Sequence, residues 1–185
     1  MKVNAIFDSR RQEYYDPLIE TLQTQGITDY EIWPCLILPT VIESINASHK
    51  MIVRQAKEFD LPEVCIWEAD CMIPAKDGWQ KFLEDMPPWK FDLYLAGTYG
   101  LNKPITGKID KINGIHSYII RKQFYDTFLS VPDHIHIDVA LDNLGLYYVR
   151  YPFIAIQRPG WSANSRAFSD KNAQLSDEDV YGGLP

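Results

Sequence analysis

The first half of the chain alternates short runs of apolar and β-branched residues with longer segments whose apolar residues recur at helical spacing. Short apolar runs bounded by turn signals are typical of buried strands, and apolar residues three or four positions apart are typical of helices. The predicted strands are 3–7, 30–33 and 64–67, and the predicted helices are 10–25 and 40–59. Gly26 ends the first predicted helix, and Pro39 stands just ahead of the second.

The second half continues this alternation with a less regular pattern. It predicts a short helix near 82–86, strands at 91–95, 116–120 and 147–156, and a helix over 122–129. Residues 134–144 are expected to begin extended and to become helical, and residues 97–113 are expected to form a mobile loop. We expect one catalytic domain over 1–168 and a poorly ordered tail over 169–185, which is rich in Ser, Asp and Gly.

Strands that alternate with helices indicate an α/β fold with a mixed, mostly parallel sheet flanked by helices. In such sheets, ligands bind beyond the carboxyl ends of the strands. Asp8 follows the first predicted strand, and Glu68-Ala69-Asp70 follows the third. These two positions are therefore the first candidates for a binding site.

Composition and charge narrow the class of ligand. The chain has 185 residues and a net charge of −7, which suits one globular domain and argues against nucleic-acid binding. Short basic pairs such as Arg10-Arg11 can serve a diphosphate but not a duplex. The three cysteines (Cys35, Cys65 and Cys71) do not have zinc spacing, and no apolar run approaches the roughly 20 residues of a membrane span. We expect a cytoplasmic protein with reduced thiols.

Glu68-x-Asp70 is the strongest local signal. Two carboxylates just beyond a buried strand repel each other unless a cation or an arginine relieves them. Carboxylate oxygens suit Mg²⁺ or Mn²⁺, which in turn bind diphosphate oxygens. The alternative is a solvated acidic turn, which is common. The apolar strand ahead of the pair favours the metal site.

Histidines supply the second group of candidates. In an extended segment, His134, His136 and Asp138 would share one strand face and could bind a transition metal, or they could be an exposed polar face. His49 interrupts the long helix within a polar stretch, so it either faces a ligand or is a core histidine. Likewise, Arg10 and Arg11 either reach a phosphate or are solvated. The chain has neither a nucleophile elbow nor a Gly-rich phosphate loop, which disfavours nicotinamide and ATP enzymes.

Six segments in the same order resemble glycosyltransferase family 25, the group of the bacterial lipooligosaccharide sugar transferases. The resemblance spans about residues 3–168. The matching segments are the first strand with Asp8-Ser9-Arg10-Arg11, Ser44 to Lys50 with its Ala47-Ser48-His49, Cys65 to Asp70, Gly114 to Ile120, Ile137 to Leu141, and Pro152 to Gln157. The family implies a GT-A-like fold, a nucleotide-sugar donor, and Mn²⁺ or Mg²⁺ at an acidic triplet. The triplet's middle position is Ala69 in this chain, which leaves one carboxylate fewer.

Together these features predict metal-assisted glycosyl transfer from a nucleoside-diphosphate sugar to a glycan or lipid-linked acceptor. Asp138 is the candidate catalytic residue, and Glu68, Asp70 and His136 are the candidate metal ligands. The candidate donor-binding residues are Asp8, Arg10, Arg11, His49 and Ala69. Two alternatives remain: a non-catalytic nucleotide- or glycan-binding relative, which Ala69 and the short chain suggest, and a metal-dependent hydrolase built on His134, His136 and Asp138.

Overall fold

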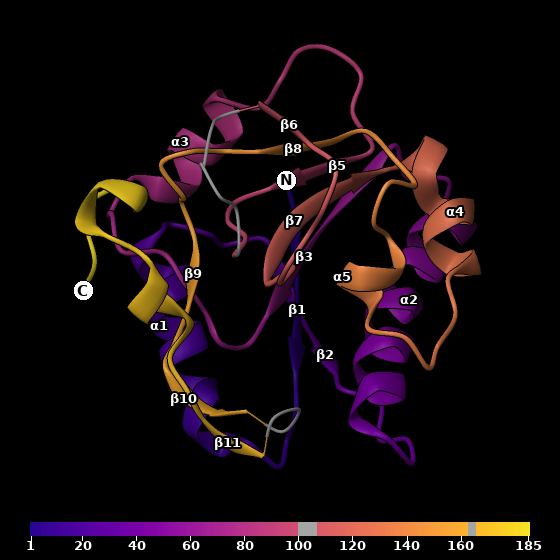
Figure 1. Cartoon of the computed structure of the whole chain (residues 1–185), viewed down its shortest axis with the longest axis horizontal. Coiled ribbons are helices and arrows are strands. Elements are labelled where there is room, and N and C mark those ends of the chain that lie inside the picture. Colours follow the sequence, from indigo (N-terminus) through magenta and orange to yellow (C-terminus); the bar gives the residue numbers. More distant parts are fainter. Residues whose placement is uncertain (100–106, 163–165) are drawn as a thin grey trace.

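The computed structural model describes residues 1–99, 107–162 and 166–185. Within these residues, seven strands form one sheet in the order β2-β1-β3-β7-β5-β8-β6 (Figure 1). The strands are β1 (Val3–Phe7), β2 (Tyr30–Pro34), β3 (Glu63–Glu68), β5 (Leu93–Leu95), β6 (Gly107–Ile109), β7 (Ser117–Arg121) and β8 (Tyr147–Val149). The expected α/β class with a mixed sheet flanked by helices is confirmed, but the sheet is not mostly parallel, since three of its six described strand pairs are antiparallel. β1 pairs in parallel with β2 and β3, and β5 with β8, whereas β7 runs antiparallel to both of its neighbours and β6 antiparallel to β8.

Helices cover both faces of this sheet. The α-helices are α1 (Tyr15–Thr24), α2 (Val41–Glu58), α3 (Gly78–Glu84), α4 (Tyr125–Ser130) and α5 (Ile137–Ala140). Short 3-10 helices are η1 (Gln12–Tyr14), η2 (Lys122–Phe124), η3 (Lys171–Gln174) and η4 (Asp177–Asp179). Figure 1 shows α2, α4 and α5 on one side of the sheet and α1 and α3 on the other. The described residues contain no helix that is long and apolar enough to cross a membrane.

Strand alternation divides the core into two layers. In β3, Val64 and Ile66 pack in the cluster that contains α2, α4 and α5, whereas Cys65 and Trp67 pack in the cluster that contains α1 and α3. Both sets of side chains are almost fully buried. The strand is therefore apolar and buried from Val64 to Trp67, and it ends at the half-buried Glu68.

α2 begins at a capping box, in which the Thr40 hydroxyl accepts from the Glu43 backbone N–H at 3.1 Å and the Glu43 carboxylate accepts from the Thr40 N–H.

The structure corrects two predicted segments. Residues 134–136 form a turn instead of a strand, because the segment is clamped to α2 and its only helix is Ile137–Ala140. Within the predicted loop 97–113, Gly107–Ile109 form β6 on the edge of the sheet, and residues 100–106 lie outside the described residues.

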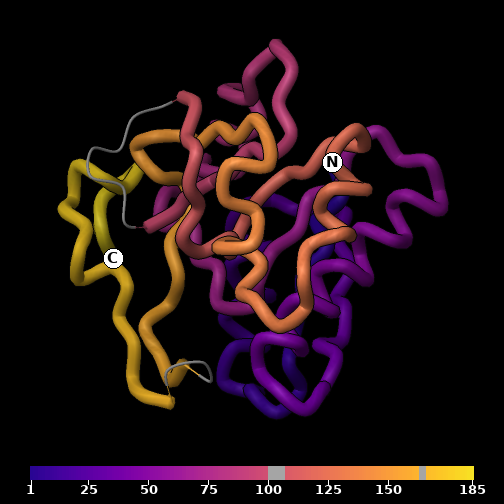
Figure 2. Tube along the Cα trace, turned by 45° about the vertical axis from the view of Figure 1, so that its right-hand side comes forward, coloured from indigo at the N-terminus to yellow at the C-terminus, as the bar shows by residue number. Residues whose placement is uncertain are grey.

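Two two-stranded sheets involve the C-terminal part of the chain, and one of them joins it to β4. β4 (Cys71–Met72) pairs with β9 (Ile156–Gln157), and β10 (Gly160–Ser162) pairs with β11 (Ala167–Ser169). Figure 2 shows the last, yellow segment lying beside the orange segment that carries β9 and β10. Phe153 forms a β-bridge with Val180. The division of the chain at residue 168 stays a prediction.

Candidate functional site

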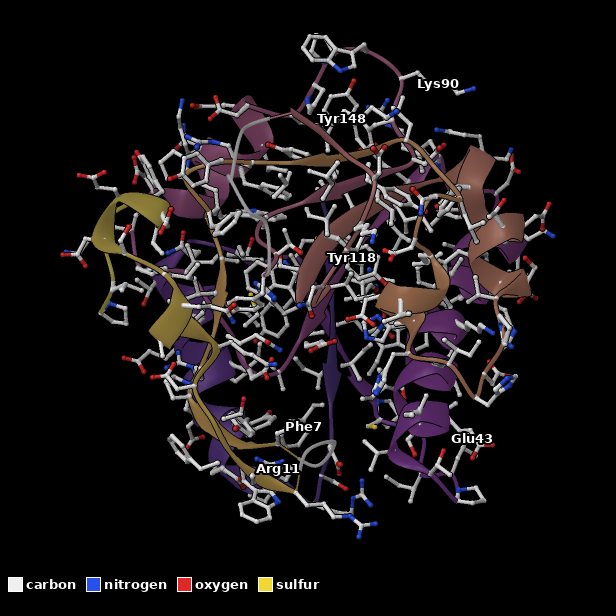
Figure 3. The ribbon with its side chains drawn as sticks, in the orientation of Figure 1. Phe7, Arg11, Glu43, Lys90, Tyr118 and Tyr148 are labelled. Atoms are coloured by element: carbon white, nitrogen blue, oxygen red, sulfur yellow. The ribbon has the colours of Figure 1, made fainter. Side chains whose placement is uncertain are left out.

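Two adjoining pockets open where β1 and β3 end, at the end of the molecule where Figure 3 labels Phe7 and Arg11. The larger has a volume of about 380 Å³ and the smaller about 180 Å³, and both are lined by Arg11, Tyr14, Glu68 and Asp70. The nine side chains that the sequence nominates for glycosyl transfer line one or both pockets: Asp8, Arg10, Arg11, His49, Glu68, Ala69, Asp70, His136 and Asp138. His134 of the alternative metal site lines neither pocket. The structure thus brings together residues that lie up to 130 positions apart, since Asp8 and Asp138 are the outermost of them (138 − 8).

Glu68 and Asp70 are held by one amide. The Gln157 Nε2 lies 3.4 Å from Glu68 Oε2 and 3.3 Å from Asp70 Oδ2. The pairing of β4 with β9 places Gln157 opposite Cys71, one residue after Asp70. The sequence resemblance includes Gln157 as the end of a strand but assigns it no role, because the pairing of the two short strands is a tertiary feature.

The two carboxyl groups have opposite pKa shifts. Burial raises the pKa of Glu68, but the hydrogen bond from His49 and the charges of His49 and His116 outweigh it, so the pKa of Glu68 is lowered. Burial and the charge of Glu68 raise the pKa of Asp70 to about 7, although the hydrogen bond from Gln157 opposes the shift. A cation bound beside Glu68 and Asp70 would favour the ionised form of Asp70.

His49 is a buried histidine that contacts the site through Glu68. Its Nδ1 lies 2.8 Å from the Tyr118 hydroxyl, and its Nε2 lies 3.2 Å from Glu68 Oε1. Figure 3 shows Tyr118 near the middle of the sheet, so the line of contacts runs from the core to the pocket. Both ring nitrogens are therefore engaged, and the imidazole orients Glu68 while it lines the smaller pocket.

The polar stretch of α2 faces two loops. The Ser44 and Ser48 hydroxyls accept the backbone N–H groups of Leu38 and Leu36. Asn46, which is fully buried, has its Nδ2 between 2.7 and 3.3 Å from the carbonyls of residues 132, 133 and 135. Its Oδ1 accepts the N–H of Ile137 at 3.1 Å. The same helix therefore holds the turn that leads into α5.

Asp138 lies in α5 and is oriented by backbone donors. Its Oδ2 accepts from the Gly114 N–H at 2.9 Å, and its Oδ1 accepts from the Val139 N–H at 2.8 Å. Gly114 has φ of 81°, and a Cβ there would lie 3.1 Å from the Tyr99 ring. The positive φ favours glycine at this position, and a Cβ there would press against the Tyr99 ring.

The structure does not form the histidine metal site. His134 is exposed, whereas His136 and Asp138 are half-buried and line the larger pocket. Among the described residues, no three His, Cys, Asp or Glu side chains converge to hold a metal ion. The strand face that was to align His134, His136 and Asp138 is absent because a turn replaces it, and His136 does not join Glu68 and Asp70 as a third ligand.

Asp8 and Arg10 form a bidentate ion pair directly after β1, with Arg10 Nη2 2.5 Å from Asp8 Oδ2 and Arg10 Nε 2.9 Å from Asp8 Oδ1. The Arg10 hydrogen bond holds the pKa of Asp8 below its usual value. Arg11 is placed differently: its guanidinium lies over the Tyr14 ring at 4.8 Å and pairs with Glu13 at 2.6 Å. Arg10 is more than half exposed, whereas Arg11 turns inward to both pockets.

Three buried charged atoms around the larger pocket have no hydrogen-bond partner among the described residues: Asp70 Oδ1, Arg11 Nη2 and Arg158 Nε. Arg158 follows Gln157, and another of its guanidinium nitrogens, Nη2, donates to Pro17 O at 3.2 Å and to Thr21 Oγ1 at 2.9 Å. Buried polar atoms normally find partners, so these atoms indicate a ligand with both positive and negative groups. No local sequence signal identified Arg158, which reaches the pocket because β9, just ahead of it, pairs with β4.

The donor set of Glu68 and Asp70 fits a hard divalent cation that completes its coordination on a ligand. Mg²⁺ is usually held by one or two protein carboxylates together with water and substrate phosphate oxygens. The free Oδ1 of Asp70 is a suitable oxygen for such an ion. Arg11 and Arg158 are placed to bind the anionic part of the same ligand.

Comparison with known proteins gives a likeness of fold. No family model and no curated protein matches the chain. The crystal structure of A197 from STIV has a TM-score of 0.50 and 15% identity, over 91% of this chain and 93% of that one. Mannosyltransferase PcManGT from Pyrobaculum calidifontis, solved with GDP-Man and Mn²⁺, has a TM-score of 0.48 and 9% identity, over 75% of this chain and 49% of its own. A glycosyltransferase involved in glycosylation of the major capsid of PBCV-1 has a TM-score of 0.43 and 12% identity, over 68% and 62% of the two chains. Membership of glycosyltransferase family 25 stays a prediction.

Proposed function

We propose that this chain transfers a sugar from a nucleoside-diphosphate sugar to a hydroxyl of a glycan or lipid-linked acceptor. The observation that carries the proposal is the set of unpartnered atoms around the larger pocket, Asp70 Oδ1, Arg11 Nη2 and Arg158 Nε, in the described part of the chain. A diphosphate with a bound divalent cation supplies a positive group for the carboxylate and negative groups for both guanidinium ions. The order of the sequence segments that resemble glycosyltransferase family 25 supports the same class of donor.

Different groups of residues in the two pockets bind different parts of the substrate. Glu68 and Asp70 would hold Mg²⁺ or Mn²⁺, which would supply positive charge to stabilise the departing diphosphate. Arg11 and Arg158 bind diphosphate oxygens. The smaller pocket, lined by Asp8, Arg10, His49 and Ala69, takes the nucleoside.

Asp138 acts on the acceptor side. During transfer, the bond between the anomeric carbon and the diphosphate oxygen breaks, and a bond from that carbon to the acceptor oxygen forms. The acceptor hydroxyl proton moves to Asp138, whose carboxylate is fixed by the Gly114 and Val139 N–H groups and keeps free lone pairs on both oxygens. Bound acceptor in the larger pocket excludes water from the anomeric carbon.

The test is turnover with a panel of nucleotide sugars, measured as release of the nucleoside diphosphate with Mn²⁺ present. The wild-type chain is expected to consume one donor, and Asp70→Asn is expected to reduce release by at least a hundredfold because a metal ligand is lost. Asp16→Asn, an exposed carboxylate on α1, is the matched control and should retain full activity. Equal turnover by Asp70→Asn would refute the proposal. Tight donor binding without transfer or hydrolysis would instead support the non-catalytic relative.

A further inference from the structure

The C-terminal segment, expected to be a poorly ordered tail, returns to the larger pocket. Ser169 and Lys171 line that pocket, beyond the last residue of the family resemblance. Figure 2 shows this yellow segment running back along the chain that carries β9 and β10. The pocket therefore includes a cationic side chain from a part of the chain to which the sequence analysis assigned no function.

Asn172 anchors this segment to the centre of the site. The residue is 8% exposed, its Nδ2 donates to Gln157 O at 2.9 Å, and its Oδ1 accepts from the Tyr99 hydroxyl at 3.3 Å. The same hydroxyl accepts from the Gln157 N–H at 2.8 Å. Asp170 caps η3 by accepting from the Asn172 N–H at 3.0 Å. The backbone at Lys171 is thus fixed relative to Gln157, whose amide contacts both acidic residues of the site, while the lysine side chain stays free to move.

Lys171 differs from the other two cations of the pocket in its freedom to move. Arg11 is held by Glu13 and Tyr14, and Arg158 is held by backbone and hydroxyl groups of α1. Within residues 1–99, 107–162 and 166–185, no carboxylate pairs with Lys171. A lysine ammonium on a flexible four-carbon stem can follow a phosphate as a point charge.

We infer that Lys171 binds the diphosphate of the donor at the phosphate next to the sugar, and that Asn172 is the positioning residue that holds it there. This inference rests on the proposed function. The phosphate next to the sugar is favoured because the nucleoside occupies the smaller pocket, whereas Lys171 lines only the larger one. Lys171 is exposed, so its ammonium is accessible to a ligand, and the buried Asn172 beside it fixes the backbone from which its side chain extends.

The test compares nucleoside diphosphates with the corresponding monophosphates. Dissociation constants for the uridine, guanosine, cytidine and adenosine pairs are measured by calorimetry with Mn²⁺, on the full chain. Lys171→Ala is expected to weaken diphosphate binding about tenfold, the effect of one charge-assisted hydrogen bond, and to leave monophosphate binding unchanged. Lys171→Arg should stay within about threefold of wild type. Lys90→Ala is the matched control, since Figure 3 shows Lys90 at the opposite end from Arg11.

The role of Asn172 is tested in the same assay by a double-mutant cycle. Asn172→Ala should weaken diphosphate binding by a factor similar to that of Lys171→Ala, and the double variant should be little weaker than either, because both changes remove one contact. Independent, multiplying effects would show that Asn172 does not act through Lys171.

The two proposals fail differently. Unchanged diphosphate binding in Lys171→Ala, or equal weakening of both nucleotides, would overturn the inference while leaving the proposed function intact. Failure of the wild-type chain to bind any of these nucleotides would refute the proposed function and this inference together.

Discussion

Replacing Asp70 with asparagine is expected to stabilise the metal-free protein at alkaline pH while it abolishes function. Burial and the charge of Glu68 raise the pKa of Asp70 to about 7. The folded protein therefore keeps a proton on Asp70 over a pH range in which the unfolded chain has lost it. Because the folded state binds more protons, the free energy of unfolding falls as the pH rises from the unfolded pKa of about 4 through the folded pKa.

The magnitude follows from the shift. At about 1.4 kcal/mol per pKa unit, the two units between pH 5 and the folded pKa of about 7 correspond to about 3 kcal/mol of lost stability by pH 8. Asp70 is half-buried at the pocket wall, and screening by water there reduces the expected effect to about 2–3 kcal/mol. Burial also lowers the pKa of His116, which changes stability in the opposite direction over part of this range. The difference between the Asp70→Asn variant and the wild type cancels that contribution.

The assay is urea unfolding of both proteins at pH 5 and pH 8, with EDTA present and Asp16→Asn as the control. The stability difference, Asp70→Asn minus wild type, should be more favourable at pH 8 than at pH 5 by about 2–3 kcal/mol. In a thermal scan, this corresponds to roughly 5–10 °C for a domain of this size. A difference that is the same at both pH values, or that favours the wild type at pH 8, would refute the reasoning.

Three further substitutions test other parts of the site. Gln157→Leu removes the amide that holds both carboxylates and should raise the Mn²⁺ dissociation constant at least tenfold in a metal titration, so an unchanged constant would show that the amide is dispensable. His134→Ala should change neither metal content nor nucleotide binding, because this histidine is exposed, and a loss of bound metal would revive the hydrolase alternative. Asn46→Ala should destabilise the fold by about 2–4 kcal/mol in urea and should lower kcat more than it raises KM, because the turn that carries Asp138 loosens. Wild-type stability and kcat in that variant would show that Asn46 does not hold the turn that carries Asp138.

The acidic pair and its position were predictable because they depend on local sequence. An apolar strand that ends in Glu68-x-Asp70 is visible without the fold, and the end of a strand in an α/β sheet is where ligands bind. The polar stretch in α2 was a partial signal. Poor helix formers such as Asn46 indicated that the helix faces something polar, but its partners lie 86 to 91 residues away, so no local pattern identifies them.

The rest of the site depends on contacts that have no local signature. Arg158 reaches the pocket because β9 pairs with β4, and Lys171 reaches it because Asn172 is bound by Gln157 and Tyr99. The extended histidine segment was predicted from alternation alone. In the structure, hydrogen bonding from Asn46 of α2 holds that segment in a turn instead.

The central claim is that the Glu68 and Asp70 pair binds a nucleoside diphosphate together with a divalent cation. The most direct measurement is the thermal stability of the wild type and Asp70→Asn with nucleoside diphosphates and nucleotide sugars, each with and without Mn²⁺. For the wild type, a ligand at 100 times its dissociation constant should add about 2.7 kcal/mol of stability, which is several degrees, and this gain should require Mn²⁺ and disappear in Asp70→Asn. Stabilisation by no nucleotide, or by one that binds equally well without the metal and without Asp70, would contradict the account.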